Sequence, residues 1–531
     1  MFQRGGWMIR ERVRKRIEEV IKDLYGVEVS PDVNRSEKYG DFATNVAFVL
    51  AKTLKRNPKE IAEEIAGKLD EPAFERVEAL NGFINVYISH EGWIKELESA
   101  LEENYGKAEL GKGERVLIEF VSANPTGPLN VANARAAAFG DALVRLFRFC
   151  GYRADAEFYV NDCGRQFELL GESIEARLKG EEPPEDGYKG DYIVEIAEEI
   201  KKEGREKEGR EFFSRYAVER IVEWQRKALE RYRVHFDNWV FESEIRKKGK
   251  VEEVLEKLKD NIVEEEGAKW FLSGKFGDRR EKRVVVKKDG SYTYLLPDIA
   301  YHLNKFERGY ELLIDLLGPD HIDQVPSIRA GLAALGYPPE KLEVIIIQWV
   351  NLIQDGQKIK MAKRKGKFVD MEWLLDEVGV DAARFFFLMR KASSPLDFDL
   401  DLAKEESQRN PVYYVQYAHA RIHNVIEFAK SKGIDPEDKG DLSNLKEKEE
   451  VELIKKIAEF PEIIQDAVRE RDPTRIPFYL MDLASFYHSF YQHHRIVGSP
   501  YEKERLALCR GTINVLKKGL ELIGVSAPLR M

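Results

Sequence analysis

Residues 115–149 read RVLIEFVSANPTGPLNVANARAAAFGDALVRLFRF, and this stretch decides the fold class. The mostly apolar run from Val116 to Val121 predicts a buried parallel strand, and the residues rich in Asn, Pro and Gly after it predict a turn. An Ala-rich amphipathic helix is expected from about Asn130. Such a unit can bind phosphate, because the free N–H groups and the helix dipole point at an anion. An ordinary strand–helix unit without a ligand is the alternative.

Composition bounds the class of protein. The 531 residues suffice for about three or four domains, with 43% hydrophobic and 34% charged residues. No apolar run reaches the roughly 18–20 residues that span a bilayer, and the N-terminal MFQRGGWMIRERVRKR lacks the apolar stretch of a secretory signal. Three cysteines without metal-ligand spacing favour a reduced cytoplasm. The net charge of −10 argues against a generally basic nucleic-acid surface but allows a local one.

Hydrophobic patterning divides the chain into domains. Helical spacing predicts helices at about 9–24, 41–54 and 58–69, and the alternating segment VEALNGFINVYIS after them predicts strands. Apolar strands recur in the middle of the chain, and periodic helical stretches fill the last part. We therefore predict a multidomain α/β protein with an α+β domain at 1–108, a parallel-sheet domain at 109–400 carrying a charged helical insertion at about 181–290, and an all-α bundle at 401–531.

Several motifs spread over nearly the whole chain resemble one family. The loop SANPTGPL at Ser122–Leu129 precedes the four-residue element Asn130-Val131-Ala132-Asn133. The other matching stretches are GDFATN at 40–45, GFIN at 82–85, YVNDCGRQ at 159–166, KMAK at 360–363 and DAARFFFLM at 381–389. Together they resemble the arginyl-tRNA synthetases of class I. The resemblance implies a Rossmann-like catalytic core, an N-terminal domain that grips the tRNA elbow and a C-terminal anticodon-binding domain.

The resemblance also implies a reaction and its ligands. Arginine and ATP would give arginyl-adenylate, with Mg²⁺ bridging the phosphates, and arginine would then pass to the terminal adenosine of tRNA(Arg). A cytoplasmic monomer without a metal site of its own is expected. The implied arginine site is Ser122 and Asn124 at the backbone of arginine, Asp320 near its amino group, and Tyr294 and Asp298 on its guanidinium. The implied ATP site is Pro128, Asn130, Ala132, Asn133, His321, Lys360 and Lys363, of which Asn130, Asn133, Lys360 and Lys363 would act in catalysis.

The chemistry of these residue types agrees with the implied roles. A guanidinium has five fixed donors and favours a planar, partly buried carboxylate, although an isolated Asp is more often a cap or a surface residue. The implied tRNA contacts are Phe42 and Asn45 at the elbow, and Tyr414, Tyr417 and Tyr487 at the anticodon. Aromatic rings beside cations suit unpaired bases, which stack at about 1–3 kcal/mol each. A helix cap at 41–45 and an aromatic core in the bundle are the alternatives.

The ATP motif departs from the family pattern. The family's H-x-G-H element is Asn130-Val131-Ala132-Asn133 here, and its K-M-S-K loop carries Ala362. Asparagine can donate a hydrogen bond to a phosphate but cannot become cationic. Losing one pre-placed transition-state donor typically costs about 10²–10³ in rate. Two hypotheses follow: an arginine–tRNA ligase, with impaired or intact catalysis, and an inactive synthetase-like or redesigned chain that keeps the fold and tRNA binding.

Overall fold

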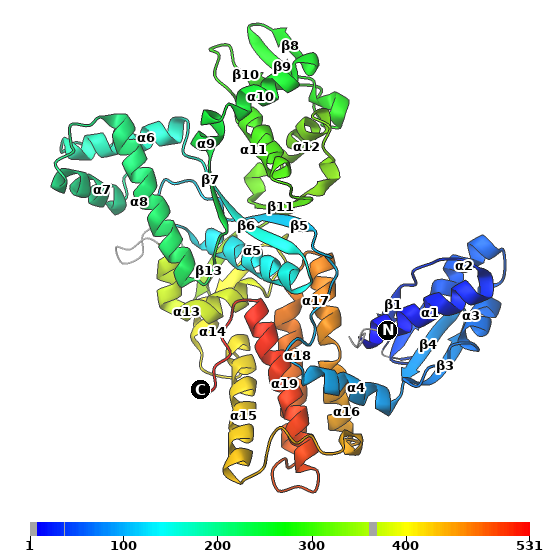
Figure 1. Ribbon diagram of the computed structural model, residues 1–531. Coiled ribbons are helices and arrows are strands. Elements are labelled where there is room, and N and C mark those ends of the chain that lie inside the picture. The colour runs from blue at the N-terminus through cyan, green and yellow to red at the C-terminus, as the bar shows by residue number, and fades with distance from the viewer. Residues whose placement is uncertain (1–7, 37, 360–368) are drawn as a thin grey trace.

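The computed structural model describes residues 8–36, 38–359 and 369–531. Figure 1 shows a small N-terminal domain in blue, a central α/β region in cyan to yellow, and a C-terminal helical bundle in yellow to red. None of the helices in the described ranges is long and apolar enough to cross a membrane. The predicted fold class, a multidomain α/β protein with a parallel core sheet, is confirmed.

The N-terminal domain is a four-stranded antiparallel sheet, of order β1-β2-β4-β3, with three helices. Its elements are α1 Ile9–Tyr25, β1 Val33–Arg35, β2 Phe42–Thr44, α2 Val46–Leu54, α3 Pro58–Ala66, β3 Phe74–Leu80 and β4 Phe83–Ile88. Asn81 and Gly82 have positive φ of 52° and 88° and join β3 to β4 by a tight turn, as an Asn-Gly pair favours. The helix expected at 41–54 begins only at Val46, because residues 42–44 pair with β4.

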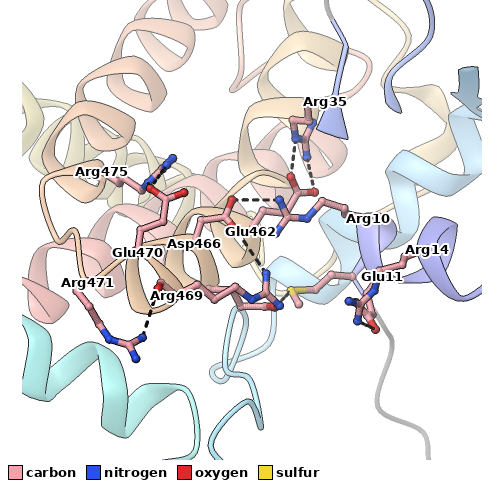
Figure 2. Close-up of polar contacts among 12 residues, drawn as sticks. Arg10, Glu11, Arg14, Arg35, Glu462, Asp466, Arg469, Glu470, Arg471 and Arg475 are labelled. Carbon is pink, nitrogen blue, oxygen red and sulfur yellow. Dashed lines mark hydrogen bonds and ion pairs between the residues drawn. The ribbon is translucent and has the colours of Figure 1, made fainter. Parts of the chain in front are cut away.

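Ion pairs join this domain to the bundle. Arg10 donates two hydrogen bonds to Asp466, at 3.0 and 2.9 Å, and Arg35 donates two to Glu462, at 2.8 and 3.0 Å. Figure 2 shows both pairs, with the two arginines reaching across to one bundle helix. The connecting helix α4, His90–Ala100, packs against helices α16 and α19 of the bundle. Bidentate arginine–carboxylate pairs of this kind fix the orientation of the N-terminal domain relative to the bundle as well as the distance between them.

The core is a five-stranded parallel sheet of order β12-β11-β5-β6-β7. Its strands are β5 Arg115–Glu119, β6 Arg153–Val160, β7 Asn238–Phe241, β11 Leu312–Leu317 and β12 Leu342–Ile346. Val116 and Ile118 pack on the side of α5, Val131–Phe149, whereas Leu117 packs with α11, Leu295–Glu307, and α12, Val325–Ala334. Helices thus cover both faces, which explains the continuous apolar run of β5.

Close packing sets the position of α5 against the end of β5. A Cβ at Gly140 would lie 2.0 Å from the ring of Phe120, the residue that follows β5. Only glycine lets the helix approach the strand this closely. The N-terminus of α5 is therefore held at the carboxyl edge of the sheet, where parallel sheets bind ligands.

The region between β6 and β11 is less uniform than the helical insertion expected at 181–290. It begins with α6 Arg165–Leu178, α7 Asp191–Lys202 and α8 Arg210–Arg231, and then returns to the core sheet as β7. The chain continues with α9 Glu242–Lys247, α10 Lys250–Lys257, and a separate antiparallel sheet of β8 Ile262–Glu265, β9 Ala268–Phe271 and β10 Arg283–Val286. Only the first part of the expected insertion is therefore purely helical.

The remaining elements complete the core and form the bundle. A three-stranded sheet of β13 Val350–Gln354, β14 Gln357–Lys358 and β15 Leu396–Asp399 lies beside α13, Met371–Phe387, which is kinked at Gly379. The bundle consists of α14 Leu400–Lys404, α15 Pro411–Ser431, α16 Lys448–Ile457, α17 Phe460–Arg469, α18 Arg475–His493 and α19 Glu502–Leu522.

Candidate active site

A cavity of about 300 Å³ opens at the carboxyl ends of β5, β6 and β11. Five of the residues implied by the family resemblance line it: Ser122, Asn124, Tyr294, Asp298 and His321. They come from three separate parts of the chain, which the parallel topology brings to one sheet edge. Asp320 is exposed on a short 3₁₀ turn, Pro319–His321, and is not among the residues that line the cavity.

Asp298 is the charged group best placed for a cationic ligand. It lies in the first turn of α11, and no described residue donates a hydrogen bond to its carboxylate. Burial raises the pKa of Asp298 to about 7, and the carboxylates of Glu242 and Glu119 add to this effect. His302 and Lys305 oppose the shift. The site thus holds a half-buried acid whose ionised form would be stabilised by a bound cation.

The other buried charges near the cavity are already paired. Lys305 is fully buried and bridges two carboxylates, with its Nζ 2.5 Å from Glu119 Oε2 and 2.8 Å from Asp315 Oδ1. His302 Nε2 lies 2.7 Å from Asp315 Oδ2, and Ser122 Oγ donates to Glu119 Oε1 at 2.8 Å. This network lies on β5, β11 and α11 and contacts the loop at Ser122. It supports the floor of the cavity and contacts the Asp298 backbone carbonyl through His302 Nδ1, at 2.7 Å, but does not use the Asp298 carboxylate.

Aromatic side chains form one wall. Tyr159 and Tyr301 stack with their centroids 4.3 Å apart, and the Tyr159 hydroxyl donates to Glu242 Oε2 at 3.0 Å. Tyr294 caps the start of α11 and is 66% exposed, so its ring lies at the mouth of the cavity. An apolar wall with one free carboxylate suits the flat guanidinium better than a compact ammonium.

At the N-terminus of α5 the two asparagines bond to each other. The Asn130 side chain accepts from the Asn133 backbone N–H, and the Asn133 side chain accepts from the Asn130 N–H, both at 2.9 Å. This reciprocal pair is a capping box. Pro128 and Asn130 are exposed and Ala132 is half-buried. Lys360 and Lys363 lie outside the described residues. The Met371 backbone N–H donates to the Leu129 carbonyl, next to Asn130, at 2.8 Å.

The residues implied as tRNA contacts differ in how exposed they are to solvent. Phe42 and Tyr487 are both fully buried, so in this structure their rings pack the core and cannot stack on a base. Asn45 is exposed, and its side chain makes no cap hydrogen bond. Tyr414 and Tyr417 are half-buried on α15. The spacing of aromatic residues along a strand or helix cannot distinguish a ring that packs in the core from a ring that contacts RNA. The expected tRNA contacts of Phe42 and Tyr487 are therefore corrected here, because both rings are buried.

Tyr417 belongs to a second cavity, of about 560 Å³, in the bundle. The Arg421 guanidinium lies 4.6 Å from the Tyr417 ring centroid and 5.0 Å from that of Tyr491. Phe428 and Tyr491 at this cavity are 52% and 40% exposed. These are ring faces beside a cation, the combination that binds unpaired bases.

The prediction missed several residues that shape the active-site cavity. Glu119, Asp315, His302 and Lys305 were not singled out, and all four are buried. A signal was present, because Glu119 and Asp315 are charged residues inside otherwise apolar strands, where an acid is rare unless it is paired. Lys305 and His302 gave no such signal, since they become adjacent to these acids only through the packing of α11 on the sheet.

Among the described residues, no group of three His, Cys, Asp or Glu side chains is placed to hold a metal ion.

Comparisons with known proteins agree with this arrangement. Three family models match consecutive parts of the chain: the arginyl-tRNA synthetase N-terminal domain at residues 8–88, the class I (R) tRNA synthetase catalytic domain at 96–394, and the DALR anticodon-binding domain at 415–531. The arginine–tRNA ligase of Bacillus subtilis is 44% identical, covering 94% of this chain and 93% of its own length. That of Geobacillus kaustophilus is 43% identical over 98% and 99%. The chain belongs to the arginyl-tRNA synthetase family.

Solved structures of the family have the same fold. A structure from Campylobacter jejuni assigned to this family is 37% identical, with a TM-score of 0.76, and covers 83% of this chain and 99% of its own. The arginyl-tRNA synthetase of Thermus thermophilus has a TM-score of 0.81 over 99% of this chain and 100% of its own, at 24% identity. At this low identity, the similarity to the Thermus thermophilus structure supports the fold alone.

Proposed function

We propose that this chain is an arginine–tRNA ligase whose arginine site is built around Asp298. The observation that carries the proposal is a half-buried carboxylate with no described hydrogen-bond donor, in a cavity at the carboxyl edge of a class I core sheet. A guanidinium there would gain a charge-assisted pair and would relieve the unfavourable burial of the acid. The names and the high coverage of the relatives support the same activity.

The other residues of the cavity receive roles from their positions. Ser122 and Asn124, on the loop after β5, would contact the backbone of arginine, and Tyr294 would close over its side chain at the mouth. Asp320 can reach the amino group only if its turn moves toward the cavity, since it is exposed and outside the lining residues. A carboxylate oxygen of arginine would attack the α-phosphorus of ATP, and pyrophosphate would leave.

The ATP side of the proposal rests on Pro128, Asn130, Ala132, Asn133 and His321, with Lys360 and Lys363 meeting the charge that develops on the pyrophosphate. Mg²⁺ would be bound by phosphate oxygens and water, the ligands that this small ion prefers. A hydroxyl of the terminal adenosine of tRNA(Arg) would then attack the arginyl carbonyl, and AMP would leave. We propose that the ATP-binding residues limit the rate of arginine activation, because neither Asn130 nor Asn133 can carry a positive charge.

A second function is favoured by the capping box at α5. Both asparagine side-chain oxygens already accept hydrogen bonds from backbone N–H groups, so only the neutral Nδ2 amides could meet a phosphate, and neither carries a positive charge. A chain of this kind could keep arginine and tRNA binding without catalysis. The bundle cavity at Tyr417 and Arg421 would take anticodon bases in either case, and we keep the expectation of a monomer.

Charging of tRNA(Arg) with labelled arginine tests the first function, and tRNA binding without charging would support the second. Binding should weaken steeply with salt despite the net charge of −10, because phosphate contacts release counterions. Anisotropy titrations at two salt concentrations check this. Equal, salt-insensitive affinity for any RNA would remove tRNA(Arg) from the list of partners.

A further inference from the structure

The loop after β5 is held from outside the core sheet, by side chains of α7 and α8. Its backbone is irregular: Val121 and Ser122 have positive φ of 68° and 36°, which L-residues rarely adopt. Within the loop, the Asn124 carbonyl accepts from the Thr126 backbone N–H at 2.8 Å. The Thr126 and Gly127 carbonyls accept from no backbone N–H among the described residues, so they need donors from elsewhere in the molecule.

Gln225 on α8 supplies two of these donors. Its side-chain Nε2 donates to the backbone carbonyls of Asn124, at 3.3 Å, and Gly127, at 3.0 Å. The Gln225 side chain is 1% exposed, and its own Oε1 is buried without a hydrogen-bond partner among the described residues. A polar group kept buried with one atom unsatisfied is costly, so its two bonds to the loop are the evident reason for its presence.

Tyr192 on α7 supplies the third donor. Its hydroxyl donates to Thr126 O at 2.5 Å, and a Cβ at Gly127 would lie 3.3 Å from its ring. The ring thus packs against the glycine while the hydroxyl bonds to the preceding residue. Three carbonyls of one short loop, those of Asn124, Thr126 and Gly127, are therefore bonded by two residues that lie far away in the sequence.

We propose that Gln225 and Tyr192 are positioning residues for arginine activation, acting through the loop 122–128. Neither lines the active-site cavity, whereas Ser122 and Asn124 of the loop do. The two residues would set where Asn124 lies relative to Asp298, whereas Ser122 is held by Glu119 and by the Tyr159 backbone N–H. Misplacing reacting groups by about 1 Å can cost about 10²-fold in rate, so small shifts of this loop matter. The functional part of this inference rests on the proposed function, but the structural part does not.

Hydrogen–deuterium exchange of the ligand-free protein tests the structural part. Tyr192→Phe removes one hydroxyl, and the peptide covering 121–130 should exchange about fivefold faster, the effect of one hydrogen bond. Gln225→Leu removes two donors at similar volume, and the increase should be at least about tenfold. Tyr216→Phe is the matched control, since it loses a hydrogen bond from α8 to Glu203 at 2.8 Å, away from the loop. Its loop exchange should be unchanged.

Arginine binding and kinetics test the functional part. Both loop variants should raise the KM for arginine more than the KM for ATP, with Gln225→Leu lowering kcat/KM by at least about tenfold. A residue with a merely structural role would speed exchange throughout α7 and α8 instead. That outcome, or unchanged exchange at 121–130 in both variants, overturns the proposal. If the unmodified protein binds no arginine, the proposed function fails, and the exchange result still decides whether the loop is held in this way.

Discussion

At the proposed arginine end of the site a half-buried carboxylate has no described donor, whereas at the proposed ATP end, beside the cavity, two asparagines bond to each other. Asp298 has a raised pKa and no described hydrogen-bond donor, while Asn130 and Asn133 form a closed reciprocal pair. The two ends lie on one sheet edge and share the loop after β5. If the proposed roles hold, the difference teaches that amino-acid recognition and nucleotide chemistry can be altered separately in one site, because they would depend on different side chains.

The largest expected effect is at the arginine end. Asp298→Asn should weaken arginine binding by about 3–5 kcal/mol, because a guanidinium would then be buried without its counter-charge. Calorimetry with arginine measures this loss. Glu307→Gln at the far end of the same helix is the control, since Glu307 pairs with Lys250 at 2.9 Å and is remote from the cavity. Unchanged affinity in Asp298→Asn would move the amino-acid pocket elsewhere and would remove the contrast between the two ends.

A pH titration should sharpen the contrast. Because the pKa of Asp298 is raised to about 7, its carboxyl group is mostly protonated at pH 6 and must lose a proton to pair with arginine. Arginine affinity should therefore rise about tenfold between pH 6 and pH 8. The sign is opposite for the free protein, in which this group's contribution to stability is lost as pH rises toward 7. Affinity that is flat with pH would mean that Asp298 is already ionised in the free protein.

The smallest effect concerns the cap at the ATP end. Asn130→Ala should lower the local opening free energy at the start of α5 by about 1 kcal/mol, the usual worth of a side-chain cap. Hydrogen exchange of the first amides of α5 measures it. Asn45→Ala is the matched control, because Asn45 precedes α2 without a side-chain cap bond and should cost only a few tenths of a kcal/mol. Equal effects would mean that the asparagine pair does not stabilise the helix.

Local patterns in the sequence predicted much of this fold, and the family resemblance implied the named part of the site. The loop at Ser122 and the acid at Asp298 were both expected, and both line the cavity. Tertiary pairing was harder to predict. Residues 42–44 form a strand only because β4 lies beside them, and β7 is too short to be recognised before its partner β6 is placed.

The supporting residues escaped prediction for a similar reason. Lys305 is a common surface residue type in a helix, and only its contact with Glu119 and Asp315 shows that it is buried and paired. Gln225 and Tyr192 lie far in sequence from the loop that they contact. Contacts between distant segments are a property of the assembled fold, so they cannot be inferred from spacing along the chain.

Arginine-dependent ATP–pyrophosphate exchange, measured with tRNA(Arg) present, tests the central claim most directly. The claim is that the arginine end is intact and that residues 130–133 limit the rate. The triple variant Asn130→His, Ala132→Gly and Asn133→His should raise exchange by at least about tenfold while leaving the affinity for arginine unchanged. An unmodified protein whose exchange the triple variant does not improve would contradict the account, because the asparagines would then serve in place of the histidines.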